Sequence, residues 1–307
     1  MSDEKKLPTF IEVVEVGPRD GFQNLQSFIP TPIKIKIIRK MIMSGIKAME
    51  LTSFVHPGAI PQMADAAEVV RLIHRDYPDK GFRSIALVPN LFGAKKAHAA
   101  GIREVSYVIS ASEKHNLANI NRTHEQSLAD LRTIIAELPE LEIRLDIATA
   151  FGCPFQGPVE LDMVKGMIDR GLSLGAKKII LCDTIGVANP TQVLQIVVDV
   201  QSSFPGLPLG LHLHDTRGMG LANVLAGLEG GITTFESSVG GLGGCPFAPG
   251  AAGNIATEDL VNMVHAMGIK TGIDLEKYMQ AVQSVKEEIQ TNLSSHMAYA
   301  KQYEGIS

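Results

Sequence analysis

The feature that most constrains the fold is a short apolar run that recurs eight times along the 307-residue chain. Each run is rich in β-branched and aliphatic side chains, which is typical of a parallel strand buried on both faces. The eight predicted strands are Phe10–Val16, Ala48–Thr52, Ser84–Val88, Glu104–Ser110, Glu142–Thr149, Lys178–Asp183, Leu209–His214 and Thr233–Val239.

Helices are predicted between these runs, because apolar residues recur there three and four positions apart. Thr31 before Pro32, and Asn189 before Pro190, predict two helix starts. The predicted helices considered individually are Thr31–Gly45, a small one near Leu91–Ala100, Thr191–Phe204, Thr257–Met267 and Leu275–Leu293. Four glycines that follow helical patterns are expected in the left-handed conformation that ends helices: Gly45, Gly101, Gly171 and Gly175.

Eight alternations of strand and helix predict an α/β fold, a closed (β/α)8 TIM barrel with additional C-terminal helices. We expect a single domain over 1–307, with the barrel at about 10–268 and a helical extension at about 274–307. The alternative is an open doubly wound sheet with a second domain. The sequence disfavours it, since no linker interrupts the pattern and no G-x-G-x-x-G turn follows the first strand.

Composition excludes several classes of protein. The charge balance of 28 Lys and Arg against 33 Asp and Glu, with no basic block, argues against a nucleic-acid partner. No stretch approaches the roughly 18 apolar residues that a membrane span needs. Three cysteines spread widely do not form a disulfide framework, which indicates a reducing interior and a cytoplasmic location.

The candidate chemistry lies where strands end, because barrel active sites form at the C-terminal ends of the strands. His212 and His214 are two residues apart on one strand, so both imidazoles face the same side. With Asp20 expected on the same rim, they predict an open site for Mg²⁺, Mn²⁺ or Zn²⁺. The alternative is a pair of hydrogen-bonded core histidines.

The Arg19-Asp20 pair follows the first strand and is flanked by Gly17, Pro18 and Gly21, which together predict a tight turn. In that turn the aspartate can serve as a ligand or base, and the arginine can face developing negative charge. An exposed surface pair is the alternative reading. Glu50, at the end of the second apolar run, is expected to pair with the arginine.

A glycine-rich segment lies between Gly240 and Asn254, with six glycines in fifteen residues. It carries Cys245 in its middle and follows the eighth strand, so it predicts a flexible lid that brings a thiol over the site. A flexible surface connection is the alternative. The other cysteines, Cys153 and Cys182, are expected to be inert core residues.

Five motifs together resemble the 3-hydroxy-3-methylglutaryl-CoA (HMG-CoA) lyases over nearly the whole chain. They are GPRDGFQN (17–24), ELTSFVHP (50–57), CDTIGVANP (182–190), HLHDTRGMGLAN (212–223) and SSVGGLGGCPFAPGAAGNIATEDLV (237–261). The resemblance implies a metal-dependent TIM barrel that cleaves an acyl-CoA thioester of this kind to acetyl-CoA and a β-keto acid, acetoacetate in the type reaction. It also implies a homodimer.

The resemblance also implies roles for individual residues. The four implied ligands of Mg²⁺ or Mn²⁺ are Asp20, His212, His214 and Asn254. The implied catalytic residues are Arg19, Asp20, Glu50, Asp183, His212 and Cys245. Asp20 or His212 would take the proton of the C3 hydroxyl. Arg19 would stabilise the enolate, and Cys245 or a water that it positions would protonate it.

Four positions depart from the pattern of many family members: Phe22, Leu25, Arg217 and Met219. We expect them to flank the acyl pocket, which points to citramalyl-CoA or a longer-branched 3-hydroxyglutaryl-CoA as alternative substrates. A Claisen condensation synthase is less favoured, because the chain has Pro18-Arg19-Asp20-Gly21 where those enzymes carry L-R-D-G. A non-catalytic acyl-CoA-binding barrel is also less favoured, because the ligand set is intact.

Overall fold

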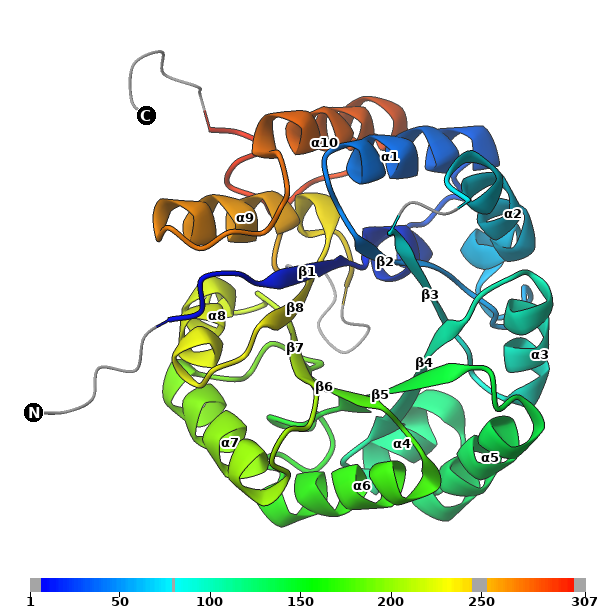
Figure 1. The fold of residues 1–307 in the computed structure, drawn as a ribbon, viewed down its shortest axis with the longest axis vertical. Helices are drawn as coiled ribbons and strands as arrows, with labels where there is room; N and C mark the ends of the chain where they lie inside the picture. Colours follow the sequence, from blue (N-terminus) through cyan, green and yellow to red (C-terminus); the bar gives the residue numbers. More distant parts are fainter. Residues whose placement is uncertain (1–6, 79–80, 245–252, 301–307) are drawn as a thin grey trace, which may run out of the picture.

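The structure is a computed structural model that describes residues 7–78, 81–244 and 253–300. Eight parallel strands close into a barrel in the order of the sequence, which confirms the predicted TIM barrel (Figure 1). The strands are β1 (Glu12–Glu15), β2 (Ala48–Ser53), β3 (Arg83–Leu87), β4 (Glu104–Ser110), β5 (Glu142–Ala148), β6 (Lys178–Asp183), β7 (Leu209–Leu213) and β8 (Thr234–Ser237).

The barrel closes where the first strand pairs with the last, with Val14 opposite Glu236 and Glu15 opposite Ser237. A small cluster of buried apolar side chains, which includes Val14 and Val16, is separate from the main core. The main core draws side chains from both the strands and the helices. The apolar runs therefore form strands because both faces of the sheet are covered.

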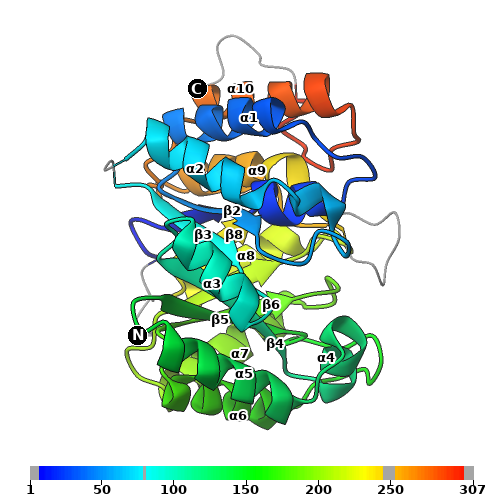
Figure 2. The ribbon, with the colours of Figure 1, turned by 90° about the vertical axis from the view of Figure 1, so that its right-hand side faces the viewer.

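Helices surround the sheet in Figure 1. They are α1 (Thr31–Met43), α2 (Ala66–Asp76), α3 (Leu91–Ala99), α4 (Glu113–Ile120), α5 (His124–Glu137), α6 (Leu161–Leu174), α7 (Pro190–Ser203), α8 (Gly220–Glu229), α9 (Thr257–Ala266) and α10 (Leu275–Ile289). The C-terminal helix α10 lies alongside α1 on the outside of the barrel in both views (Figures 1 and 2). No helix in the described part of the chain is long and apolar enough to cross a membrane.

The predicted helix ends are only partly correct. The Asn189 side chain accepts a hydrogen bond from the backbone N–H of Gln192 at 3.0 Å, which confirms that start. Thr31 is not a cap but the first helical residue, and its hydroxyl donates to Asp65 at 2.8 Å. The last helix stops at Ile289 rather than Leu293, because Gln290 is left-handed with φ 53°. The contact of Thr31 with Asp65, the residue before α2, and the left-handed backbone at Gln290 therefore override the helix signals in the local sequence.

Three of the four glycines end helices as expected. Gly45, Gly101 and Gly175 have φ values of 106°, 101° and 117°. Gly171 is different, since it lies inside α6. A Cβ atom there would lie 2.2 Å from Cδ2 of Leu145, so the glycine allows α6 to pack closely on β5.

Candidate active site

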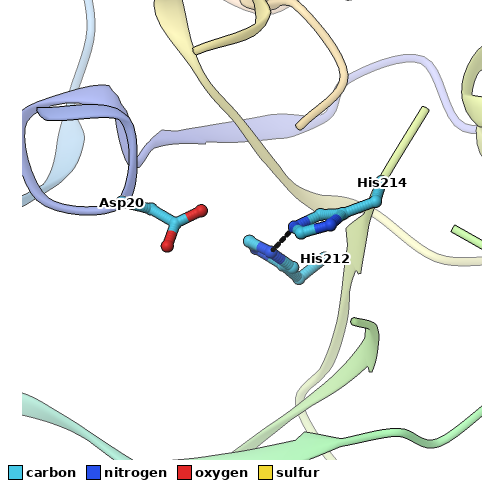
Figure 3. A group of neighbouring side chains, drawn as sticks. All are labelled: Asp20, His212 and His214. Carbon is cyan, nitrogen blue, oxygen red and sulfur yellow. Dashed lines mark hydrogen bonds between the residues drawn. The ribbon is translucent and has the colours of Figure 1, made fainter. Parts of the chain in front are cut away.

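A cluster of Asp20, His212 and His214 lies at the C-terminal ends of β1 and β7 (Figure 3). One potential ligand atom from each residue lies within 4.8 Å of the others, and all three residues are buried. The structure therefore brings together the three residues that the sequence nominated as a metal site. Their chemistry, one carboxylate and two imidazoles, is that of a divalent-cation site with open positions.

Asp20 reaches the cluster because the chain makes a single π-helical turn, Gly17–Gly21, directly after β1. The carbonyl oxygen of Val16 accepts hydrogen bonds from the backbone N–H groups of Arg19 and Asp20, at 3.1 and 2.7 Å. A Cβ atom on Gly17 would lie 2.6 Å from Oε1 of Glu15. Glycine is thus required where this turn begins.

Their surroundings shift the pKa values of the two histidines in opposite directions. Burial acts to lower the pKa of His212, but a hydrogen bond from its Nδ1 to Glu236 at 2.8 Å, together with the charge of that carboxylate, raises it overall. Burial lowers the pKa of His214 to about 3. Because the Nδ1 proton of His212 faces Glu236, its Nε2 lies on the cluster side, 3.1 Å from Nε2 of His214. Both Nε2 atoms can therefore face one cation.

Asn254 joins the cluster through its amide. Its Nδ2 donates to Asp20 Oδ2 at 2.6 Å and to the carbonyl oxygen of Leu242 at 3.0 Å, and its backbone forms a β-bridge with His214. Its Oδ1 is buried without a hydrogen-bond partner. A buried orphan carbonyl oxygen is costly, so this atom suits coordination to a cation.

Arg19 is clamped between two carboxylates. Its Nε donates to Glu50 at 2.5 Å, and its NH1 donates to Asp20 at 2.6 Å. Burial opposes the charge of Arg19, but Glu50 and Asp20 outweigh it and raise the pKa of the guanidinium. Burial acts to raise the pKa of Asp20, but the charges of Arg19 and the two histidines have the larger effect, so the pKa is lowered overall. The pair therefore stays ionised, and Glu50 has the partner that the sequence predicted.

A buried arginine beneath the cluster was missed at the sequence level. Arg144 on β5 is 1% exposed. Its NH1 lies 2.6 Å from Glu236, its Nε lies 3.0 Å from Asp146 and its NH2 lies 3.6 Å from Glu50. Since Glu236 holds His212 and Glu50 holds Arg19, Arg144 connects both sides of the cluster. Two charged residues on one face of an apolar strand, Arg144 and Asp146, were the available signal.

The remaining candidates have mixed outcomes. Asp183 accepts hydrogen bonds from the backbone N–H groups of Val187 at 2.9 Å and Ala188 at 3.1 Å, and burial raises its pKa to about 6. Asp183 therefore holds the loop after β6 in position. Cys182 is buried on β6 and burial raises the pKa of its thiol, which fits the expected inert cysteine, although it also lines the cavity described next. Cys245 lies outside the described residues.

A cavity of about 670 Å³ opens from the cluster. Its lining at the inner end includes Arg19, Asp20, Asp146, Cys182, His212 and Glu236, and toward the loops after β2, β3 and β4 it includes His56, Ile60, Asn90, Asn119 and Arg122. None of the four departures Phe22, Leu25, Arg217 and Met219 lines it. That they flank the acyl pocket stays a prediction from the sequence. Phe22 packs in the hydrophobic core instead, and Arg217 donates to the carbonyl oxygen of Gly186.

Known proteins are similar to this chain in sequence and in fold. The profile of the HMGL-like family matches residues 10–285. The mouse cytoplasmic 3-hydroxy-3-methylglutaryl-CoA lyase is 41% identical over 296 residues, 96% of this chain and 85% of that protein. The Bacillus subtilis hydroxymethylglutaryl-CoA lyase YngG is 42% identical over 290 residues, 94% of this chain and 96% of its own length.

Solved structures agree with these relatives. An HMG-CoA lyase from Acinetobacter baumannii, in complex with coenzyme A and 3-methylmalate, superposes with a TM-score of 0.91 at 42% identity and 97% coverage of both chains. The carboxyl transferase domain of Rhizobium etli pyruvate carboxylase, at 16% identity and a TM-score of 0.71, shares the fold alone. With a family profile matched across most of its length and relatives more than 40% identical, this chain belongs to the HMGL-like family.

Proposed function

We propose that this protein is a divalent-metal-dependent lyase that cleaves HMG-CoA to acetyl-CoA and acetoacetate. One observation carries the proposal: a buried carboxylate, two imidazoles and an orphan amide oxygen converge at the inner end of a large cavity. The chain is also about 41% identical to proteins named as HMG-CoA lyases.

We assign the metal site to Asp20, His212, His214 and Asn254, whose mixed oxygen and nitrogen donors suit Mg²⁺ or Mn²⁺. When bound there, the ion would lower the pKa of the C3 hydroxyl of the substrate. Asp20 can take that proton, since it lines the cavity and is fixed by a hydrogen bond from Arg19; His212 cannot do so while its Nδ1–H faces Glu236 and its Nε2 holds the ion.

Arg19 supplies the positive charge for the next stage of the cleavage. Breaking the carbon–carbon bond leaves electrons on the thioester fragment as an enolate. Arg19 lines the cavity, is charged, and is held in place by Glu50 and Asp20, so it can stabilise that enolate without rearranging. Protonation of the enolate by Cys245, or by a water that it positions, stays a prediction from the sequence.

The cavity is large enough to admit the acyl group of a thioester and part of its carrier. It extends from the ligand cluster past the loops after β2, β3 and β4. Asp146 and Cys182 also line its inner wall. A related 3-hydroxyacyl-CoA, such as citramalyl-CoA, stays the alternative substrate predicted from the sequence. A homodimer and a cytoplasmic location also stay predictions; relatives of this chain are named both cytoplasmic and mitochondrial.

Turnover of HMG-CoA by the purified protein tests the proposal, with acetoacetate and acetyl-CoA as the measured products. EDTA should abolish turnover and Mn²⁺ should restore it, while Asp20→Ala should be inactive with either metal. Cleavage of citramalyl-CoA but not HMG-CoA would change the substrate and keep the chemistry. Full activity of Asp20→Ala would contradict the assigned metal site.

A further inference from the structure

One buried carboxylate outside the cavity lining has no part in the chemistry above. Glu15, the last residue of β1, is 0% exposed and accepts four hydrogen bonds. Its Oε1 accepts from the backbone N–H groups of Gly17 at 2.8 Å and Val239 at 2.9 Å. Its Oε2 accepts from the hydroxyls of Thr257, at 2.7 Å, and Tyr278. All of these partners are themselves buried.

The four donors come from four segments that meet at the Glu15 carboxylate. Gly17 begins the turn that carries Arg19 and Asp20. Val239 begins the 3₁₀ turn Val239–Gly241, which overlaps the start of the glycine-rich segment. Thr257 is the first residue of α9, three positions after Asn254, and Tyr278 lies in α10. A single side chain therefore joins the segment that carries Asp20 to the one that carries Asn254.

These two residues contact each other directly. The 2.6 Å hydrogen bond from Asn254 Nδ2 to Asp20 Oδ2 leaves the Asn254 Oδ1 free to face the cluster. That bond depends on how closely the turn after β1 approaches the segment after β8. The carboxylate of Glu15 bridges the two segments, because it accepts from Gly17 and Thr257 at the same time.

Local packing alone would not demand an acid here. Burial raises the pKa of the Glu15 carboxyl, and the hydrogen bonds from Tyr278 and Thr257 oppose that rise. An apolar side chain of similar volume would avoid the desolvation cost, but it would leave the N–H groups of Gly17 and Val239 unpaired. The acid is needed because four donors converge on one point.

We propose that Glu15 is a positioning residue for the metal site, and that Tyr278 makes the C-terminal helix α10 part of its support. Glu15 touches neither substrate nor metal; it acts by fixing the turn of Asp20 against the segment of Asn254. The proposal rests on the metal site assigned above, not on the identity of the substrate.

Mn²⁺ affinity tests this role without any substrate, by titrating full-length variants and following free Mn²⁺ by electron paramagnetic resonance. Residues that orient metal ligands typically change affinity by roughly 10–100-fold when removed. We expect Glu15→Ala to raise the Kd by at least about 10-fold on that scale. Tyr278→Phe removes one donor of the four and should raise the Kd roughly 2–10-fold, which is below that range because three donors remain.

Glu15→Gln is the conservative variant. Its amide oxygen can still accept from Gly17 and Val239, and the hydroxyls of Thr257 and Tyr278 can turn to accept from its NH₂. It should therefore bind Mn²⁺ nearly as tightly as the wild type. Val164→Ala controls for lost stability: Val164 is a buried residue of α6, which lies on the opposite side of the barrel from α10 (Figure 1). It should leave the Kd unchanged.

Wild-type Mn²⁺ affinity in Glu15→Ala would overturn the proposal, as would an equal loss in Val164→Ala. If Glu15→Ala does not fold, Tyr278→Phe decides: an unchanged Kd in that variant overturns the proposal. A wild-type protein that binds Mn²⁺ but does not cleave HMG-CoA would contradict only the proposed substrate. A wild-type protein that binds no Mn²⁺ would overturn both.

Discussion

Glu236→Gln should weaken metal binding while leaving the shape of the site almost unchanged. In the wild type, Glu236 Oε2 accepts from His212 Nδ1 at 2.8 Å, and its Oε1 lies 2.6 Å from NH1 of Arg144. A glutamine amide cannot serve both neighbours, since one of its two terminal atoms is a donor. Either orientation therefore places two donors face to face or forces a proton to move.

If the amide nitrogen faces His212, Nδ1 must accept, and the ring proton moves to Nε2, the atom assigned to the metal. If the nitrogen faces Arg144, two donors meet in a buried site. Loss of a charge-assisted hydrogen bond costs about 1.5–3 kcal/mol. Loss of a residue that orients a metal ligand typically costs 10- to 100-fold in affinity, or about 1.4–2.8 kcal/mol. The two ranges agree.

Calorimetric titration of Mn²⁺ into the metal-free protein measures this loss directly. Glu104→Gln is the matched control, because Glu104 is a buried carboxylate that pairs with Arg83 and Lys178 but lies at the first residue of β4, at the other end of the barrel. The control should lose stability and keep its Mn²⁺ affinity. A Glu236→Gln protein with a Kd within twofold of wild type would refute the reasoning about the tautomer of His212.

Three further predictions concern stability and the glycine-rich segment. Gly171→Ala should lower the free energy of unfolding by about 1–3 kcal/mol, because the added methyl group would overlap Leu145. Gly166→Ala, in the same helix, has open space for the methyl group and should raise the free energy of unfolding by up to about 1 kcal/mol. Urea unfolding measures both changes. Burial raises the pKa of Glu258 to about 7 in the folded protein. The protonated carboxyl therefore stabilises the fold below the pKa that Glu258 has in the unfolded chain, and this stabilisation is lost as the pH rises through 7. Glu258→Gln should therefore gain roughly 2–3 kcal/mol over wild type between pH 5 and pH 8, and equal pH profiles of the two unfolding curves would contradict this. Cys245→Ala should reduce kcat far more than it weakens thioester binding, and full turnover in a steady-state assay would rule out its role as an acid.

The order of strands and helices was predictable because the pattern of apolar residues within each element reflects how that element is buried. A parallel strand covered on both faces must be apolar along its length, so the eight runs could be found one by one. Helix ends depend on distant contacts. The hydroxyl of Thr31 bonds to Asp65 instead of capping its own helix. Leu293 leaves the helical pattern because its side chain packs on Gly240 after the chain reverses at Gln290.

The candidate site was predictable to the extent that its residues stand out locally. His212 and His214 share a strand face, and Asp20 follows a glycine turn, so their convergence follows from the barrel alone. Arg144 could not be assigned in the same way. Its partners Glu50 and Glu236 lie on β2 and β8, which are distant from β5 in the sequence. The role of a single charge inside an apolar run can be assigned only once the folded barrel brings these strands together.

The hydrogen bond between Asn254 and Asp20 joins residues 234 positions apart. It can form only when β1 meets β8, which is the contact of longest sequence separation in the barrel and one of the most costly in chain entropy during folding. A site that includes both side chains is therefore completed only when the barrel closes. A cation that binds there favours the closed barrel over every open state by mass action, so metal availability would influence how much of this chain reaches its native state.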